Sequence, residues 1–205
     1  MPRVPRQQRA IATADAIVEA GFIAVATHGV TGTTTNLIAD IAGIGIGSLY
    51  EYYANKEAVY AAMQQRMVSD AVAVITPLMN EVTRLDIYPA AKLLLVHMEA
   101  FLLRDDSRYL KYAQQALSVN LQLPLAPLIE VLRELILRYL MQHPDNLRMQ
   151  NIPTMSYIMI NGAIFIVLRH LSDPNPPISF TQLSDGLAGM VSAYAASELA
   201  SADRK

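Results

Sequence analysis

Glycine alternates with isoleucine across residues 43–47, and glycine-rich segments of this kind cradle phosphate groups in many nucleotide-binding enzymes. A dinucleotide loop must follow a strand and precede a ribose-binding acid, and a phosphate loop must end in Gly-Lys-Ser or Gly-Lys-Thr. Neither requirement is met, since Gly47 is followed by Ser48 and Leu49. The segment therefore does not predict an enzyme that binds nucleotides.

Metal and thiol chemistry are not expected either. The chain contains no cysteine, which excludes a thiolate nucleophile, a disulfide framework and a cysteine metal site, and makes a reducing cytosol the simplest compartment. The histidines are far apart and lack the helical spacing of paired metal ligands. They are His28, His97, His143 and His170. We expect no catalytic residue, no cofactor and no bound metal.

Residues 34–57 carry the pattern of two short helices that cross at a tight turn. Two helices approach closely only where a small residue permits it, and Ala39 lies beside Ile38 on the face expected to meet Leu49. Gly43 supplies the sharp turn between the helices. This is the pattern of a helix-turn-helix, in which the second helix enters the major groove of DNA and the first crosses the backbone.

The distribution of charge agrees with DNA as the partner. The net charge of −2 argues against indiscriminate coating of nucleic acid, so the position of the basic groups matters more than their sum. Only basic charges, those of Arg3, Arg6 and Arg9, precede Asp15, and they form a cationic arm that leads into the first helix. An acidic body would then orient the molecule by repelling the phosphates.

The elements that must position these residues are all helical, because helical periodicity dominates and no alternating run predicts a strand. A first helix should end near Gly29, and a threonine of the triplet 33–35 should cap a short helix that reaches Ala42. A second short helix follows over about 46–53, and Asn55 should cap a long helix that reaches Val74 or beyond. Proline and polar breaks then separate five further helices, expected at 89–104, 107–121, 125–143, 153–171 and 180–200.

The composition predicts extensive burial in the larger, C-terminal part. Hydrophobic residues make up 53% of the chain and charged residues 17%, so a bulky core, an oligomer interface and an apolar cavity are all expected. The segment 93–103 is apolar on nearly all sides and predicts a central buried helix. We predict an all-α protein with a helix-turn-helix domain at 1–54 and a helical ligand-binding and dimerisation domain at 55–205.

Neither the N-terminal residues nor the most apolar helix predicts a membrane protein. Asp15 and Glu19 interrupt the first apolar residues, so no secretion signal forms, and a cytoplasmic location is expected. Residues 151–168 carry no charge, but the helix from Pro153 falls short of the ~20 apolar residues that cross a bilayer. We interpret it as a buried interface helix.

The N-terminal residues also resemble the signature of the tetracycline-repressor (TetR) family of transcriptional regulators. The matching features run over about residues 9–60 and are dense. They are an alanine-rich first helix ending near Gly29, the paired threonines, Ile38-Ala39, Ala42-Gly43-Ile44, Gly47-Ser48-Leu49-Tyr50, the aromatic pair Tyr52-Tyr53, and Lys56-Glu57. The remaining residues resemble the family only in forming long helices.

This resemblance implies roles for eight residues of the N-terminal segment. The implied phosphate contacts have hydroxyl or ammonium donors, which fix register on the duplex: Thr35, Tyr50, Tyr52 and Lys56. The residues implied to face base edges are Asn36, Ile46, Gly47 and Ser48. Gly45 departs from the serine that the family often has, and base reading should rely on Asn36, Ser48, a contact of Ile46 with a thymine methyl, and DNA shape.

The sequence of the C-terminal domain predicts an effector site and a dimer. A small hydrophobic effector should lie among helices near His97, Phe101, Tyr112 and Tyr157, whose polar groups could orient it. The last two long helices are low in charge and rich in small residues, which predicts a homodimer through a four-helix contact. The predicted function is a ligand-responsive regulator, most simply a repressor released from a double-stranded DNA operator by that effector. The alternative is a helical protein-interaction module with a degenerate DNA-binding head.

Overall fold

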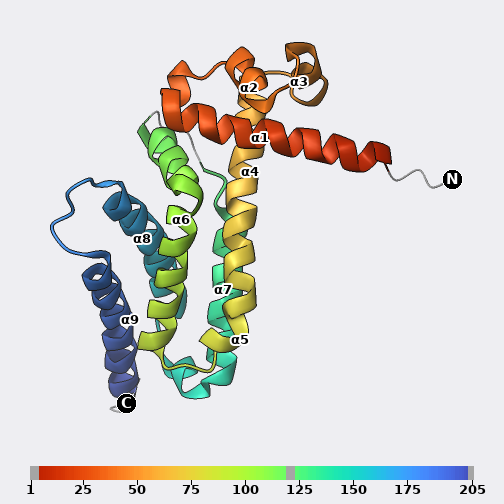
Figure 1. Ribbon diagram of the computed structural model, residues 1–205. Coiled ribbons are helices and arrows are strands. Elements are labelled where there is room, and N and C mark those ends of the chain that lie inside the picture. The colour runs from red at the N-terminus through yellow and green to blue at the C-terminus, as the bar shows by residue number, and fades with distance from the viewer. Residues whose placement is uncertain (1–4, 119–122, 203–205) are drawn as a thin grey trace. The chain divides into compact units, whose positions relative to one another are not determined.

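The computed structural model describes residues 5–118 and 123–202, and every regular element within these ranges is a helix (Figure 1). The all-α prediction is confirmed. In chain order the elements are α1 (Pro5–Gly32), α2 (Thr35–Ala42), α3 (Ile46–Tyr52), α4 (Lys56–Ile75), η1 (Thr76–Leu78), α5 (Met79–Val82), α6 (Ile87–Ser118), α7 (Ala126–Gln142), η2 (Pro144–Arg148), α8 (Ile152–Ser172) and α9 (Phe180–Ala202).

The chain forms two compact units. The head unit contains Met1–Met67 and Arg104–Pro124, and the body unit contains Val68–Leu103 and Leu125–Lys205. Helices α4 and α6 therefore each contribute residues to both units. The head unit extends beyond the span 1–54 predicted for the DNA-binding domain, because the second half of α6 is part of its core.

An aromatic cluster forms the centre of the head unit. The ring of Phe22 in α1 lies edge-on to Tyr109 and Tyr112 of α6, with centroid distances of 5.1 Å and 5.4 Å. Both tyrosines are fully buried, and the Tyr112 hydroxyl donates to the backbone oxygen of Tyr60 in α4 at 3.5 Å. Edge-to-face pairs add about 0.5–1.5 kcal/mol to the burial of their area, so this cluster joins α1, α4 and α6 firmly.

The short elements begin and end where the sequence predicts. Thr34 caps α2, since its Oγ1 accepts a hydrogen bond from the Leu37 amide at 3.2 Å. Gly43 ends α2 in the left-handed conformation, at φ 68°. The Oδ1 of Asn55 accepts from the Ala58 amide at 2.9 Å and caps α4. These three predictions are confirmed.

Two long helices contain breaks. Gly29 interrupts α1 with φ 70° and ψ 170°, close to the predicted helix end, and the helix resumes for one short turn. In α6 the break falls between the two helices predicted at 89–104 and 107–121. Here Asp105, Asp106 and Ser107 are consecutive left-handed residues, with φ of 50°, 57° and 57°. Left-handed conformation costs an L-residue roughly 1–2 kcal/mol, so this turn is strained.

In the body unit, polar contacts join α6 and α7 to their neighbours. Asp185 of α9 accepts hydrogen bonds from Lys92 and from the Tyr88 hydroxyl, the latter at 2.6 Å. His143 stacks on Tyr139 at a centroid distance of 4.3 Å, and their polar atoms bond to the backbone just before α6. The buried apolar side chains of the last three helices are Leu128, Leu135, Leu140, Ile160, Val167, Leu168, Ala188 and Ala195.

The prediction of a fully buried helix over 93–103 is wrong. Only Phe101 and Leu102 are buried in this span, Val96 and Leu103 are 43% exposed, and Leu93 to Leu95 are half-buried. The apolar character of this part of α6 therefore exceeds what the folded chain covers. The partly accessible aliphatic side chains beside the buried Phe101 and Leu102 indicate a role other than the packing of this chain alone.

Two helices are long and apolar enough to cross a membrane by length and composition, over Gln8–Gly32 and Ile152–Ser172. The core helices of water-soluble proteins pass the same test. In the head unit, α1 buries Ile17, Phe22 and Val25 within the core described above. These two helices do not indicate a membrane protein.

The strained turn of α6 gives a test of the backbone conformation. Glycine adopts positive φ without the steric cost that a Cβ imposes, so Asp106→Gly should be more stable than Asp106→Ala by about 1 kcal/mol. Both variants remove the exposed ion pair of Asp106 with Lys111, so their comparison isolates the backbone effect. Urea denaturation measures the difference, and equal stabilities would contradict a left-handed residue 106.

Candidate nucleic-acid interface

Helices α2 and α3 cross through a small apolar contact. Ile38, Ala39 and Leu49 are all essentially inaccessible to solvent, at 0%, 1% and 0%. After α2 the Gly43 amide donates to the Asp40 oxygen and the Ile44 amide to the Ala39 oxygen, each at 3.1 Å. This turn directs the chain into the seven-residue α3. The predicted helix-turn-helix packing is confirmed.

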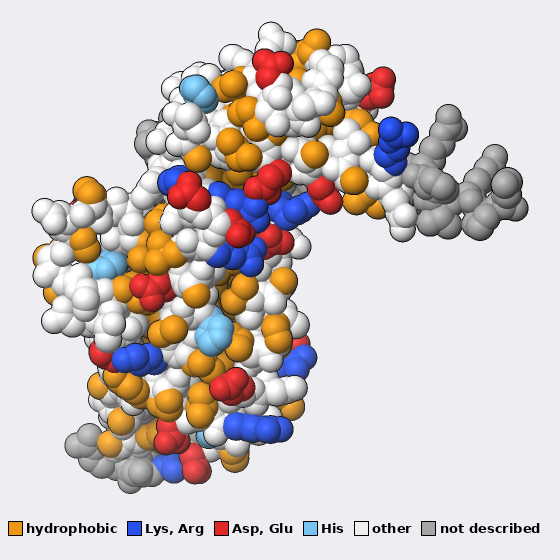
Figure 2. Space-filling model, viewed as in Figure 1, with side chains coloured by type: hydrophobic (Ala, Val, Ile, Leu, Met, Phe, Trp, Pro, Cys, Tyr) orange, Lys and Arg blue, Asp and Glu red, His pale blue; other side chains and the backbone are white. Residues whose placement is uncertain are grey.

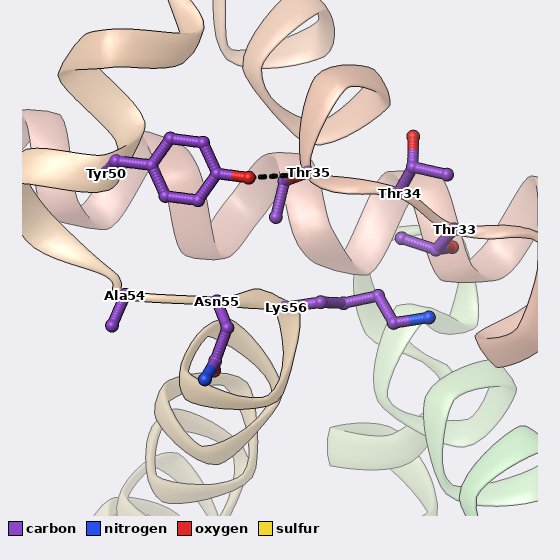
Figure 3. Close-up of a pocket in the computed structure, with 7 residues that line it drawn as sticks. All are labelled: Thr33, Thr34, Thr35, Tyr50, Ala54, Asn55 and Lys56. Carbon is purple, nitrogen blue, oxygen red and sulfur yellow. Dashed lines mark hydrogen bonds between the residues drawn. The ribbon is translucent and has the colours of Figure 1, made fainter.

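Hydroxyl groups from α2 and α3 meet at the edge of this pair. The Oγ1 of Thr35 and the hydroxyl of Tyr50 are 3.1 Å apart and share a hydrogen bond, shown as a dashed line in Figure 3. They line an open pocket of about 290 Å³. The full lining is Thr33, Thr34, Thr35, Tyr50, Ala54, Asn55 and Lys56. The arrangement gathers hydroxyl donors and one ammonium group, which is a donor set suited to an anion.

The first turn of α4 holds Lys56 at this pocket. The Lys56 ammonium lies 5.6 Å from the centre of the Tyr60 ring, within the range of a cation–π contact. The Tyr60 hydroxyl donates to the Val30 backbone oxygen at 2.8 Å, and burial raises the pKa of this phenol. The neutral ring of Tyr60 therefore lies against the Lys56 ammonium at the pocket.

The residues predicted to face base edges are available on the surface. Asn36, Ile46, Gly47 and Ser48 are all exposed. Ile46 is 38% exposed, although an isoleucine side chain is more often buried in a core. A Cβ built on Gly47 would meet no atom within 4 Å, so packing does not require glycine there.

The tyrosines differ in burial. Tyr50 and Tyr52, predicted as phosphate contacts, are 51% and 37% exposed. Tyr53 is half-buried, and burial is the main reason that its pKa is raised. Tyr53 therefore contributes to packing, in contrast to the two more exposed tyrosines. Gly45 precedes α3 and gives it no side-chain cap, as the departure from serine implied.

Most basic side chains of the head unit are engaged by carboxylates. Arg66 pairs with Asp15, Arg108 with Glu19, and Lys111 with Asp106. Figure 2 shows blue and red side chains mixed in one band of the surface. Among the described residues of the head unit, Lys56 and Arg9 are cations that pair with no carboxylate. Of the other arm residues, Arg3 and the side chain of Arg6 lie outside what the structure describes.

The residues predicted for the effector site are not gathered in one unit. Tyr112 lies in the core of the head unit, whereas His97, Phe101 and Tyr157 belong to the body unit. Phe101 is buried, Tyr157 is 64% exposed, and the Nδ1 of His97 is 2.9 Å from the backbone oxygen of Leu93 in its own helix. Burial raises the pKa of Tyr112, as expected for a phenol in a packed core.

The pocket also contains residues that were not predicted as site residues. Thr33, Thr34, Ala54 and Asn55 line it, and Tyr60 supports it. Thr34 and Asn55 were recognisable as helix caps, and a cap places its residue at a helix N-terminus where anions bind favourably. That signal could have added them to the list, whereas nothing in the sequence marks Ala54 or Tyr60.

Comparison with known proteins identifies the head. Residues 17–63 match the sequence model of the bacterial regulatory proteins of the tetR family, and this match covers α2, α3 and the first turns of α4. Residues 17–63 carry the sequence signature of the TetR-family DNA-binding segment. The matched segment contains the helix-turn-helix, and the family it matches consists of bacterial regulatory proteins.

Solved structures of regulators extend the likeness of fold over most of the chain. The fatty acid degradation regulator FadR from Bacillus halodurans superposes with a TM-score of 0.68 at 20% identity, covering 93% of this chain and 96% of that one. A TetR-family transcription regulator from Marinobacter aquaeolei gives 0.58 at 17% identity, with 91% and 97% covered. A candidate fatty acid metabolism regulator from Clostridium perfringens gives 0.54 at 18% identity, with 84% and 94% covered. No curated protein matches the sequence.

Proposed function

We propose that this TetR-family chain is a cytoplasmic, ligand-responsive repressor that binds an operator as a homodimer and leaves it when a small hydrophobic effector binds the body. The observation that carries the DNA-binding part is the cluster of Thr35, Tyr50 and Lys56 at one edge of the helix-turn-helix. TetR-family regulators bind DNA and typically form dimers, so the proposal concerns which residues of this chain do so.

The phosphate contacts come from this cluster. A phosphate oxygen in the pocket accepts a hydrogen bond from the member of the Thr35–Tyr50 hydroxyl pair that does not donate to the other, and it lies near the Lys56 ammonium. The hydroxyl pair is already aligned, so little conformational freedom is lost on binding. The exposed Tyr52 contributes a further hydroxyl. Such contacts fix the register of the protein on the duplex and carry no sequence information of their own.

Base edges are read by the exposed residues of α2 and α3. Asn36 can pair with adenine through its amide, and Ile46 offers an apolar contact to a thymine methyl. Ser48 can donate to or accept from several bases. With Gly47 between them, the backbone of α3 can approach the groove floor closely, since no side chain stands in the way.

The dimer forms through α8 and α9. About half of the circumference of α8 presents large apolar side chains to solvent: Tyr157 at 64%, Ile158 at 51%, Phe165 at 63% and Ile166 at 38%. On α9 the exposed residues include Gly186 and Met190, and the small residues of that helix allow close approach. An apolar surface of this extent on a soluble protein is typical of an interface. In a monomer this exposed apolar surface would lower the solubility of the protein.

The effector lies beside the first half of α6 in the body unit. With about 100° of rotation per residue, Leu94, His97 and Met98 share a face with Ala90 and Phe101. Ala90 and Phe101 are buried, whereas the three residues between them are only half-buried. Because these half-buried residues interrupt an otherwise buried face, we infer that an apolar ligand packs against them. The proposed site does not use Tyr112, which is fully buried in the core of the head unit.

We infer a long-chain fatty acid or its thioester as the effector class. The aliphatic lining of Leu94 and Met98 suits an alkyl chain, and His97 offers a polar contact at one side. Two structural neighbours, from Bacillus halodurans and Clostridium perfringens, are described as regulators of fatty acid metabolism. A tenfold loss of operator affinity requires the effector to favour the released state by about 1.4 kcal/mol.

Removal of the Lys56 charge should weaken binding to all DNA sequences alike. Lys56→Ala should make the plot of log affinity against log salt shallower by about one phosphate contact, or roughly 0.9 in slope. Lys111→Ala is the matched control, because Lys111 is already paired with Asp106. Fluorescence anisotropy at several salt concentrations measures both slopes. An unchanged slope for Lys56→Ala would remove Lys56 from the interface.

A charge on the exposed face of α8 should separate the dimer. Phe165→Asp should give a folded monomer, because the side chain is 63% exposed and contributes little to the core of its own chain. Leu137→Asp in α7 is the control, with a nearly equal exposure of 61%. Analytical ultracentrifugation distinguishes the outcomes. A dimeric Phe165→Asp variant, or a monomeric wild type at micromolar concentration, would overturn the assignment.

A bulky residue on the inner face of α6 should block the effector. At a free concentration of about 100 Kd, a long-chain fatty acid or acyl thioester should stabilise the wild type by about 2.7 kcal/mol and raise its Tm by several degrees. Leu94→Trp should abolish that rise, whereas Val96→Trp on the opposite, exposed face should retain it. A calorimetric series of chain lengths without effect on the wild type would contradict this effector class.

A further inference from the structure

Glu51 lies at the centre of the outward face of α3. Leu49 is fully buried, and at about 100° per residue both Gly47 and Glu51 fall within roughly 20° of the direction opposite it. Glu51 is exposed, and Gly47, one turn before it, has open space around the position of a Cβ. The side chain that projects farthest from this face of the recognition helix is therefore a carboxylate.

The fold gives no reason for an acid at this position. Glu51 is in the last turn of α3, where the negative end of the helix dipole disfavours a carboxylate. Among the described residues no basic side chain pairs with it. Across residues 35–52 the only charged side chains are those of Asp40 and Glu51, so no neighbouring cation on α2 or α3 offsets the charge. In the view of Figure 2, acidic but no basic side chains are visible over these helices.

Placing this carboxylate in a major groove brings it between two rows of phosphates. That repulsion lowers affinity for every sequence unless the carboxylate accepts a hydrogen bond from a base. The donors that bases expose in the major groove are the amino groups of cytosine and adenine. Adenine presents an acceptor, N7, beside its amino group, whereas cytosine presents only its N4 donor, so a carboxylate is better matched to cytosine.

We propose that Glu51 is a specificity-determining residue that accepts a hydrogen bond from the N4 amino group of one cytosine in each half-site. Gly47 assists by leaving the groove side of α3 bare one turn earlier, which lets the Glu51 carboxylate reach the base edge. Elsewhere on DNA the same charge has no donor and repels the backbone, so Glu51 also lowers nonspecific binding. This inference rests on the proposed placement of α3 in the major groove.

The test is selection of binding sites from a randomised duplex library by the full-length protein. Wild type, Glu51→Ala and Glu51→Gln are compared, and Glu57→Gln serves as a control that removes the same charge from an exposed acid in the first turn of α4. Wild type should prefer cytosine by about tenfold at one position of each half-site. Glu51→Ala should bring the four bases at that position close to equality, and Glu51→Gln should move the preference toward adenine, whose two groups match an amide.

The other positions of the selected site should be unchanged in both variants, and the Tm should be equal to or above that of the wild type, because no stabilising contact is lost. Glu57→Gln should leave the cytosine preference intact. The proposal is overturned if Glu51→Ala keeps that preference, or if both glutamine variants raise affinity for all sequences by the same factor. A wild type that selects no common site would remove the proposed function as well, which distinguishes the two failures.

Discussion

The edge-on packing of Phe22 against Tyr109 and Tyr112 is the contact on which the head unit depends. It joins residues almost ninety positions apart in the chain, and it makes the second half of α6 part of the same compact unit as α2 and α3. The ion pair between Arg108 and Glu19 fastens the same two helices at the surface. A helix that begins in the body unit thus ends as core of the DNA-binding unit, so any change in α6 acts on a packed element rather than on a loose linker.

The candidate nucleic-acid interface of the head unit carries few charged groups among its described residues. Its donors are hydroxyls of Thr35 and Tyr50 and the ammonium of Lys56, while the other described cations of the head are largely held by carboxylates. In the proposed function, the small number of unpaired cations among the described residues implies a small release of counterions and weak binding to arbitrary DNA. The proposal then assigns discrimination to the outward residues of α3, where Ile46, Gly47 and Glu51 stand in place of the basic side chains that commonly read guanine. In this proposal, low nonspecific affinity and dependence on base contacts both follow from the small number of positive charges on the candidate interface.

Local rules predicted much of the fold and the helix-turn-helix on which the candidate interface residues lie. Caps at Thr34 and Asn55 and the glycine turn at Gly43 depend only on neighbouring residues, so the sequence suffices to locate them. Contacts between segments that are distant in the sequence could not be predicted from neighbouring residues. Tyr112 was predicted as one of the polar groups that could orient an effector, and the sequence did not indicate that α6 divides at a left-handed turn and places Tyr112 in the core of the head unit. The half-buried side chains over 93–98 were likewise invisible to periodicity, which reports apolar character and not what covers it.

The most direct test of the central claim, that paired helix-turn-helix units of two chains grip one operator, is a hydroxyl-radical footprint of the full-length protein on a selected site. The account predicts two protected patches related by two-fold symmetry, with centres about 34–36 Å apart along the duplex, which is one helical turn. The patches should weaken together as salt is raised. A single protected patch, or uniform protection along the fragment, would contradict the account.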